Sequence, residues 1–482
     1  MRRPAKLSLL PVLLIAGVAL LGAAGQSERK AASVPPPSPK YIFIFLSDGA
    51  GITHMEITRM YSRIIHNEGL NVVDKIMKQG SIGLMTTHAA NSLSTDSAAA
   101  ATALASGCKA KIGAIGSCED GTIPKTVLEI AKENGMRIGL ITNSTLYDAS
   151  PAAFAGHVPD RTLYGPIVDQ YLKLEPDLLM GGGRDEFLPR SQPGSRRKDD
   201  SDMIGAFVKR GYVYVADKNE LARARGAKML GLFSLGEISF EIDRHGTNEP
   251  SVSDMTRAAI RRLEEGNRSG FVLFIEDEHV DSAAHLLDIA SLIQEYREFD
   301  RAVGVGYEFY LRHPEETLIL VTSDHETGGL GFTQALEELS VVNRKRIAAT
   351  EQDFKKIQSI KISLKKAAEI LGPNPTAEAV DQLMRDHFNG FIMAPDLKNM
   401  LLNKQVVARN LYTNPVVNCL GLMIANNIQA YWGTTAHTNQ PVFVAALGVG
   451  SERFRGYQDN TDFAKHLFAL LKKKMVAREA ER

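Results

Sequence analysis

Four short runs of uninterrupted apolar residues constrain the fold of this chain more than any other feature. The runs are YIFIFLSD, RIGLITNST, FVLFIED and TLILVTSDH. Such runs, which lack polar alternation, are typical of strands that are buried on both faces of a sheet. Helical patterns such as IPKTVLEIAKENG and PSVSDMTRAAIRRLEEG stand between them. This alternation predicts an α/β fold in which helices sandwich a large, mostly parallel central sheet.

An acidic residue or a histidine stands at or just after the end of each run. The first run reaches Asp48, the second leads to Asp148, the third contains Glu276, and the fourth ends at Asp324 and His325. Because ligands of parallel sheets bind beyond the carboxyl ends of the strands, we expect these side chains to form one site. Basic and acidic residues balance at 56 each, so no overall charge draws the chain to nucleic acid or to an anionic membrane.

The stretch STDSAAAATALASGC, residues 94–108, contains a candidate nucleophile. Its alanines predict a closely packed helix that begins near Asp96 and Ser97. Aspartate and serine are favoured helix caps, so a capped core helix is one interpretation. The other is that Ser97 is a nucleophile whose alkoxide, and later phosphate ester, is stabilised by the helix N-terminus. The stretch alone leaves both interpretations open.

Metal ligands are a second candidate feature, found in EDEHVDSAAH. Asp281 and His285 stand four residues apart, so on a helix they share one face and can hold one ion. A solvated acidic turn is the alternative, and it is the environment that we expect for Asp277, Glu278 and His279.

Two further stretches add candidate ligands. Asp324 and His325 are adjacent, so both can reach one ion only if the chain turns there, and the glycines of TSDHETGG allow such a turn. WGTTAHTNQPV contributes His437 just before the last predicted strand. Four carboxylates and three imidazoles suit two zinc ions and an oxygen-rich magnesium site. The seven residues are Asp48, Glu276, Asp281, His285, Asp324, His325 and His437.

The N-terminus and one internal region differ from the alternating pattern. Residues 1–26 combine a basic start with a long apolar run and predict a signal peptide, with an uncleaved membrane anchor as the alternative. The proline-rich residues 27–39 predict a stiff linker, and residues 40–482 form the catalytic domain. Within this domain, residues 331–430 predict a helical insertion without strands, before a final strand at PVFVAALG. A cleaved signal implies a secreted or periplasmic protein.

The three cysteines agree with export. Cys108 and Cys118 bracket a short loop, and in an oxidising compartment we expect them to form a disulfide, with two free thiols as the alternative. Cys419 lies in the apolar stretch VVNCLGLMIANN and is predicted to be a small buried residue.

The order of these stretches resembles the alkaline phosphatase family, of secreted bacterial type. The matching stretches include SDGAG, TDSAAAATALASGCKA, DASPAAFAGHVPDR, GFVLFIEDEHVDSAAH, TSDHETGG and AHTNQPV. The resemblance runs from about Tyr41 to the C-terminus, with the helical insertion excepted. It implies phosphomonoester hydrolysis through a phosphoserine, two Zn²⁺ and one Mg²⁺ as cofactors, and a homodimer.

The resemblance also implies roles for single residues. Ser97 matches the nucleophile, with Asp96 beside it, and Arg161 matches the arginine that grips the substrate phosphate. The ligands of the first zinc match Asp281, His285 and His437. Those of the second match Asp48, Asp324 and His325. The magnesium ligands match Asp48, Ser150 and Glu276, with Asp148 as an outer neighbour.

Two positions depart from the family pattern. Asp277 stands where the family usually has glycine, which puts the geometry of the magnesium site in question, and Ser282 replaces a residue that tunes phosphate affinity in some relatives. A two-metal phosphodiesterase or sulfatase is an alternative function, although no cysteine stands at the nucleophile position. A non-catalytic phosphate-binding protein is another, and Ser97 and Arg161 argue against it.

Overall fold

The computed structural model describes residues 38–336, 346–406 and 414–480. The predicted signal peptide, residues 1–26, and most of the predicted linker lie outside the described residues. Among the described residues, no helix combines the length and the apolar character that crossing a membrane requires.

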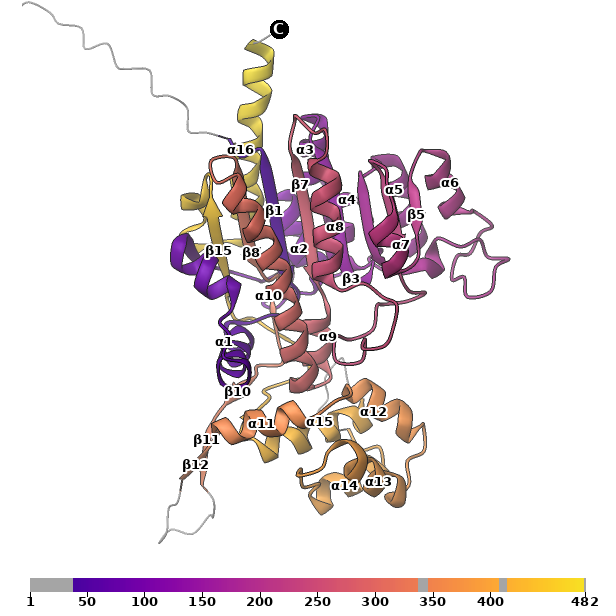
Figure 1. Cartoon of the computed structure of the whole chain (residues 1–482), viewed down its shortest axis with the longest axis vertical. Helices are drawn as coiled ribbons and strands as arrows, with labels where there is room; N and C mark the ends of the chain where they lie inside the picture. The colour runs from indigo at the N-terminus through magenta and orange to yellow at the C-terminus, as the bar shows by residue number, and fades with distance from the viewer. Residues whose placement is uncertain (1–37, 337–345, 407–413, 481–482) are drawn as a thin grey trace, which may run out of the picture. The chain divides into compact units, whose positions relative to one another are not determined.

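A ten-stranded sheet forms the centre of the fold, in the order β16-β2-β15-β8-β1-β7-β3-β4-β6-β5 (Figure 1). The four apolar runs are its adjacent parallel strands β8, β1, β7 and β3. The final predicted strand is β15, which pairs antiparallel to both neighbours. The predicted fold class is therefore confirmed. The strands are β1 (Tyr41–Ser47), β2 (Ser81–Met85), β3 (Arg137–Thr145), β4 (Leu178–Gly182), β5 (Val213–Val215), β6 (Met229–Leu232), β7 (Phe271–Asp277), β8 (Thr317–Thr322), β15 (Val442–Gly448) and β16 (Gly456–Gln458).

Helices cover both faces of the sheet because its strands are apolar on both sides. In β1, Phe43 and Phe45 belong to one hydrophobic cluster, whereas Ile42 and Ile44 belong to the other. Helices α8 and α10 pack on the first face, and α2, α3, α4 and α16 pack on the second (Figure 1). The bounds of these helices are α2 (Ser97–Ser106), α3 (Val127–Glu133), α4 (Ala149–Ala155), α8 (Val252–Glu264), α10 (Ile289–Arg312) and α16 (Asn460–Ala480).

Shorter helices complete this part of the chain. They are α1 (Ile52–Tyr61), η1 (Ser62–His66), η2 (Val72–Met77), α5 (Tyr164–Leu174), η3 (Arg184–Glu186), α6 (Met203–Lys209), α7 (Lys218–Arg223), α9 (His279–His285) and η4 (Ser451–Phe454). Among them, α9 directly follows β7 and brings its residues to the carboxyl edge of the sheet.

The region 331–430 is mostly helical, and its helices gather together in Figure 1. They are α11 (Glu351–Ser359), α12 (Leu364–Leu371), α13 (Ala377–His387), α14 (Pro395–Leu402) and α15 (Pro415–Asn427).

The expectation that the region 331–430 has no strands is wrong. β10 (Gly331–Phe332) pairs with β13 (Ala430–Tyr431) where the insertion leaves and rejoins the sheet domain, and β11 (Gln334–Leu336) pairs with β12 (Arg346–Ala348). Strands of two or three residues are too short to show a hydrophobic period, which explains why the sequence pattern missed them.

The structure confirms both cysteine expectations. Cys108 and Cys118 form a disulfide that closes the loop after α2, with the two Cα atoms 5.6 Å apart. Gly107 ends α2 at a φ of 75°, in the left-handed region, and so turns the chain into this loop. Cys419 is fully buried in α15.

We predict that replacing both Cys108 and Cys118 with serine lowers the free energy of unfolding by about 2–3 kcal/mol, the loop-entropy value for a loop of this size. Urea unfolding of the oxidised protein, the reduced protein and the double variant measures this. Cys419→Ser in a separate variant is the control for loss of a thiol. Equal stability of the oxidised and reduced protein would contradict the prediction.

Candidate active site

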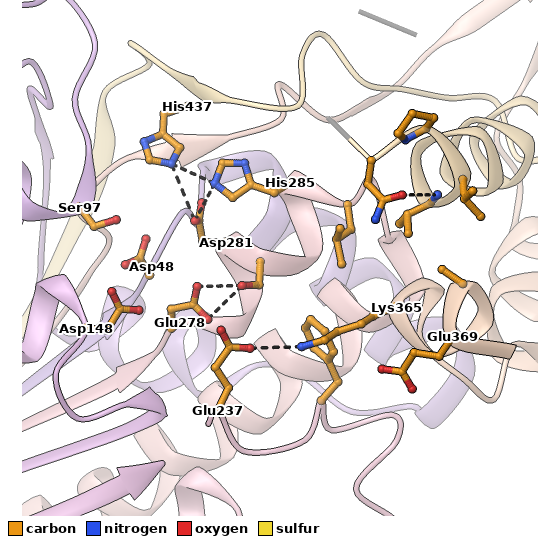
Figure 2. Close-up of a pocket in the computed structure, with 18 of the residues that line it drawn as sticks. Asp48, Ser97, Asp148, Glu237, Glu278, Asp281, His285, Lys365, Glu369 and His437 are labelled. Carbon is orange, nitrogen blue, oxygen red and sulfur yellow. Dashed lines mark hydrogen bonds and ion pairs between the residues drawn. The ribbon is translucent and has the colours of Figure 1, made fainter. Parts of the chain in front are cut away.

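The candidate site residues lie at the carboxyl edge of the central sheet. Asp48 follows β1, Asp281 and His285 lie on α9 after β7, and Asp324 follows β8 (Figure 2 labels the first three). The turn after β1 depends on Gly49, whose φ is +69° and where a Cβ atom would lie 2.4 Å from Asp281 Oδ1. Glycine at this position lets β1 and α9 approach closely enough to place their carboxylates together.

One group of metal-ligand type consists of Asp281, His285 and His437. Their ligand atoms lie within 4.8 Å of one another. His285 Nε2 is 2.9 Å from Asp281 Oδ2 and 3.0 Å from His437 Nε2. Each imidazole donates its Nδ1–H to a backbone carbonyl, of Thr435 at 2.7 Å and of Thr95 at 2.8 Å. These bonds leave both Nε2 lone pairs directed at one point, as metal binding requires.

A second group consists of Asp48, Asp324 and His325, and its ligand atoms also lie within 4.8 Å of one another. His325 Nε2 is 3.1 Å from Asp324 Oδ2 and 3.4 Å from Asp48 Oδ1. Asp48 Oδ1 and Asp324 Oδ2 are buried and accept no hydrogen bond among the described residues. Burial and the neighbouring carboxylates raise the pKa of Asp48, and that of Asp324 to about 7. Buried carboxylates in such surroundings fit a bound cation.

An oxygen-rich group adjoins the second one. Ser150 donates to Asp48 Oδ2 at 3.2 Å, and Thr142 donates to Glu276 Oε2 at 2.6 Å. Burial, and then the charge of Asp148, raises the pKa of Glu276 well above its usual range. Because hydroxyl and carboxylate oxygens are the ligands that Mg²⁺ prefers, this group fits a hard divalent cation.

Ser97 is the first residue of α2 and lies next to the second group of metal-ligand type. Its hydroxyl is 3.3 Å from His325 Nε2, and its side chain is buried. Asp96 is the N-cap, because Asp96 Oδ1 accepts the N–H of Ala99 at 3.0 Å. The capped-helix interpretation is therefore correct, and it is compatible with a nucleophile at the first helical position. All ten residues of α2 are buried, which its alanines permit.

Arg161 lies at the edge of the same site, held by two carboxylates. Its Nη1 is 3.3 Å from Asp96 Oδ2, and its Nη2 is 3.0 Å from Asp148 Oδ1. Gly113 N–H also donates to Asp96 Oδ2 at 3.0 Å, while Ala149 N–H donates to Asp148 Oδ1 at 2.6 Å. The two aspartates thereby orient the guanidinium plane, which can hold two phosphate oxygens at once.

Sequence reasoning missed Thr327, which connects the two groups of metal-ligand type. Its hydroxyl donates to Asp281 Oδ1 in one group and lies 3.3 Å from His325 Nδ1 in the other. β9 (Glu326–Thr327) pairs with β14 (His437–Thr438), so the same short strand also positions His437. Thr327 lies inside TSDHETGG, and that closeness to two candidate ligands is the one sequence signal that could have identified it.

The expectation of a solvated acidic turn at Asp277, Glu278 and His279 is wrong. Asp277 is 0% exposed and His279 is 1% exposed. Asp277 Oδ1 accepts from Asn143 Nδ2 at 2.8 Å, and burial raises its pKa to about 8. Neighbouring strand residues point to opposite faces, so Asp277 points away from the oxygen-rich group that Glu276 faces. The departure from the family pattern at position 277 therefore adds no carboxylate to that group.

Comparison with known proteins decides the family. The family model described as alkaline phosphatase matches residues 39–473. The chain belongs to the alkaline phosphatase family. Its members hydrolyse phosphoric monoesters and are metal-dependent, so the predicted enzyme class is confirmed.

Two relatives and two solved structures illustrate the similarity. Alkaline phosphatase 3 of Bacillus subtilis is 29% identical over 96% of this chain and 96% of its own, and alkaline phosphatase 4 is 30% identical over 97% of each. The crystal structure of Thermus thermophilus alkaline phosphatase matches with a TM-score of 0.80 and 28% identity over 95% of each chain. The cold-active enzyme of Shewanella sp. matches with a TM-score of 0.72 and 29% identity, over 89% of this chain and 99% of its own.

We predict that Thr327→Val weakens divalent-metal affinity about 10- to 100-fold, the usual effect of removing a hydrogen bond to a metal ligand. Valine keeps the shape of threonine, so the fold should remain. Titration of the metal-free protein with metal, followed by calorimetry, measures the affinity. The exposed Thr247 provides the control variant Thr247→Val. Unchanged affinity in Thr327→Val would show that the hydroxyl does not support the ligands.

Proposed function

We propose that this enzyme hydrolyses phosphomonoesters through a phosphoserine on Ser97, at a site for two zinc ions and one magnesium ion. The position of Ser97 carries the proposal: its hydroxyl lies at the N-terminus of α2 and 3.3 Å from His325 Nε2. An anion on this oxygen lies at the positive end of the helix.

The first step forms a bond between Ser97 Oγ and phosphorus and breaks the bond between phosphorus and the ester oxygen, which leaves as the alcohol. Arg161 binds two of the remaining phosphate oxygens, and Asp96 and Asp148 keep it in place. In the second step the oxygen of a water molecule forms a bond to phosphorus and the bond between phosphorus and Ser97 Oγ breaks. One proton of the water passes to Ser97 Oγ, and inorganic phosphate leaves. Two displacements give net retention of configuration at phosphorus.

The metal assignment follows the donor types in each group. Two groups with imidazole and carboxylate donors suit zinc: Asp281, His285 and His437 for one ion, and Asp48, Asp324, His325 and the Ser97 oxygen for the other. The oxygen-only group of Asp48, Ser150 and Glu276 suits magnesium. When bound, such ions lower the pKa of a hydroxyl or a water and neutralise the leaving oxygen.

We also propose that the protein is exported to the periplasm or secreted, and that it acts as a homodimer. The predicted signal at residues 1–26 supports export, and the Cys108–Cys118 disulfide fits an oxidising compartment. N-terminal sequencing of the fractionated protein and light scattering test these two statements. An uncut N-terminus in the membrane fraction would support the anchor instead.

We predict that Ser97→Ala lowers kcat by about 10³-fold or more, because the covalent route is lost. Rapid quenching with a ³²P-labelled monoester should trap an acid-stable phosphoenzyme in the wild type and none in the variant. Ser106→Ala, at the other end of the same helix, is the control. Near-normal turnover of Ser97→Ala would exclude Ser97 as the nucleophile, and inversion at a chiral phosphate would exclude the two-step route.

We predict that chelation abolishes monoester hydrolysis and that zinc with magnesium restores it. Elemental analysis of the restored enzyme should give two zinc ions and one magnesium ion per chain. A monoester and a diester assayed together separate this function from that of a phosphodiesterase. Full activity after exhaustive chelation, or higher turnover of the diester, would contradict the proposal.

A further inference from the structure

The cavity that contains Ser97 extends well beyond the candidate metal groups. Its volume is about 1060 Å³, at the upper end of the range for pockets that bind drug-sized organic ligands. Ser97, Asp48 and Arg161 line its inner part, and helices of the insertion line the opposite part. A phosphate group fills only a small share of such a volume. The rest is available to the organic group that the phosphate is attached to.

The part of the wall away from the metal groups combines an apolar patch with the polar and charged side chains of Glu237, Lys365, Glu369, Lys404 and Asn414. Phe240 and Leu286 come from the sheet domain, Ala368 from α12, and Val416 and Val417 from α15. Phe240 and Val417 are less than 10% exposed, whereas Ala368 and Val416 are partly exposed toward the cavity. If an apolar group bound in this space, the surface of that group and the exposed parts of these side chains would both be removed from water.

The insertion is fixed directly to the segment that joins the end of α9 to the start of α10. Leu364 N–H at the start of α12 donates to the buried Asp288 Oδ2 at 2.7 Å. In α15, Asn418 Nδ2 donates to the carbonyl of His285 at 3.5 Å, and Gly421 lies so close to Leu287 that an added Cβ would be 2.6 Å from Leu287 Cβ. The apolar wall is therefore held at a set position relative to His285.

Charged residues on the same wall form a bridge between the insertion and the sheet domain. Lys365 Nζ is 3.3 Å from Glu237 Oε2, and their side chains are 53% and 40% exposed (Figure 2). An ion pair this exposed contributes little to stability. The pair is open to solvent, so it does not close the apolar patch off from a ligand.

We propose that α12 and α15 form a leaving-group subsite, so that the enzyme prefers phosphomonoesters of large, mainly apolar alcohols to those of short alcohols. This inference rests on the proposed monoesterase function. The organic group lies between Phe240 and Leu286 on one side and Ala368, Val416 and Val417 on the other while Ser97 attacks. Contact with this wall lowers the barrier only for esters long enough to reach it.

The test compares ethyl phosphate with 2-phenylethyl phosphate, whose alcohols have similar acidity, so chemical reactivity does not separate them. We expect kcat/KM of the zinc-loaded and magnesium-loaded enzyme to be about tenfold or more higher for 2-phenylethyl phosphate. Val416→Ser should lower kcat/KM for 2-phenylethyl phosphate about tenfold more than kcat/KM for ethyl phosphate. Ile370→Ser is the matched control, because Ile370 lies on α12 in the same insertion but is 52% exposed and is not part of the cavity wall.

A second variant, Ala368→Asp, places a carboxylate on the same wall and should also reduce the preference for 2-phenylethyl phosphate. Because two variants are compared, a folding defect in one of them does not decide the result. Equal kcat/KM for the two esters in the wild type would overturn the subsite. So would a loss in Val416→Ser and Ala368→Asp that is the same for both esters. If neither ester is hydrolysed, the proposed function itself fails, and that result is distinct from hydrolysis without preference.

Discussion

Buried carboxylates at one edge of the central sheet are the constraint on which the rest of the structure depends. Asp48, Glu276 and Asp324 are each at most 2% exposed, and burial raises the pKa of all three. A charge taken out of water is costly unless an opposite charge compensates it. Cations bound at these groups, as proposed above, would supply that charge and would couple metal binding to folding.

The elements around the carboxylates explain how they remain in place. Glu326 in β9 accepts the N–H of Gly329 at 2.8 Å through one oxygen and the hydroxyl of Thr438 in β14 through the other. It thereby joins the strand after His325 to the strand that contains His437. Thr327 adds the connection to Asp281. The two groups of metal-ligand type are thus connected by hydrogen bonds, and a change in one group reaches the other.

The sequence predicts the parts of this structure that have a period or a spacing. The apolar runs gave the four central strands, and the spacing of Asp281 and His285 placed both on one face of a helix. Contacts made by backbone atoms leave no such signal: the carbonyls of Thr95 and Thr435 orient His437 and His285, and any residue could supply a carbonyl. The burial of Asp277 and His279 also leaves no signal in the sequence. It comes from α10 and the loop before α8, which pack against these residues only in the folded chain.

The insertion shows why the extent of the cavity cannot be predicted from the candidate metal ligands alone. The motifs that surround Ser97 account for the inner end of the cavity only. Part of its remaining wall comes from α12 and α15, which stand about 80 and 130 residues after His285 in the chain and lie outside the motifs named in the sequence analysis. Asp288, the N-cap of α10, and the carbonyl of His285 at the end of α9 accept hydrogen bonds from these helices, so the junction of α9 and α10 anchors this wall. The residues around Ser97 and the cavity wall from α12 and α15 therefore belong to separate segments of the chain that meet next to α9.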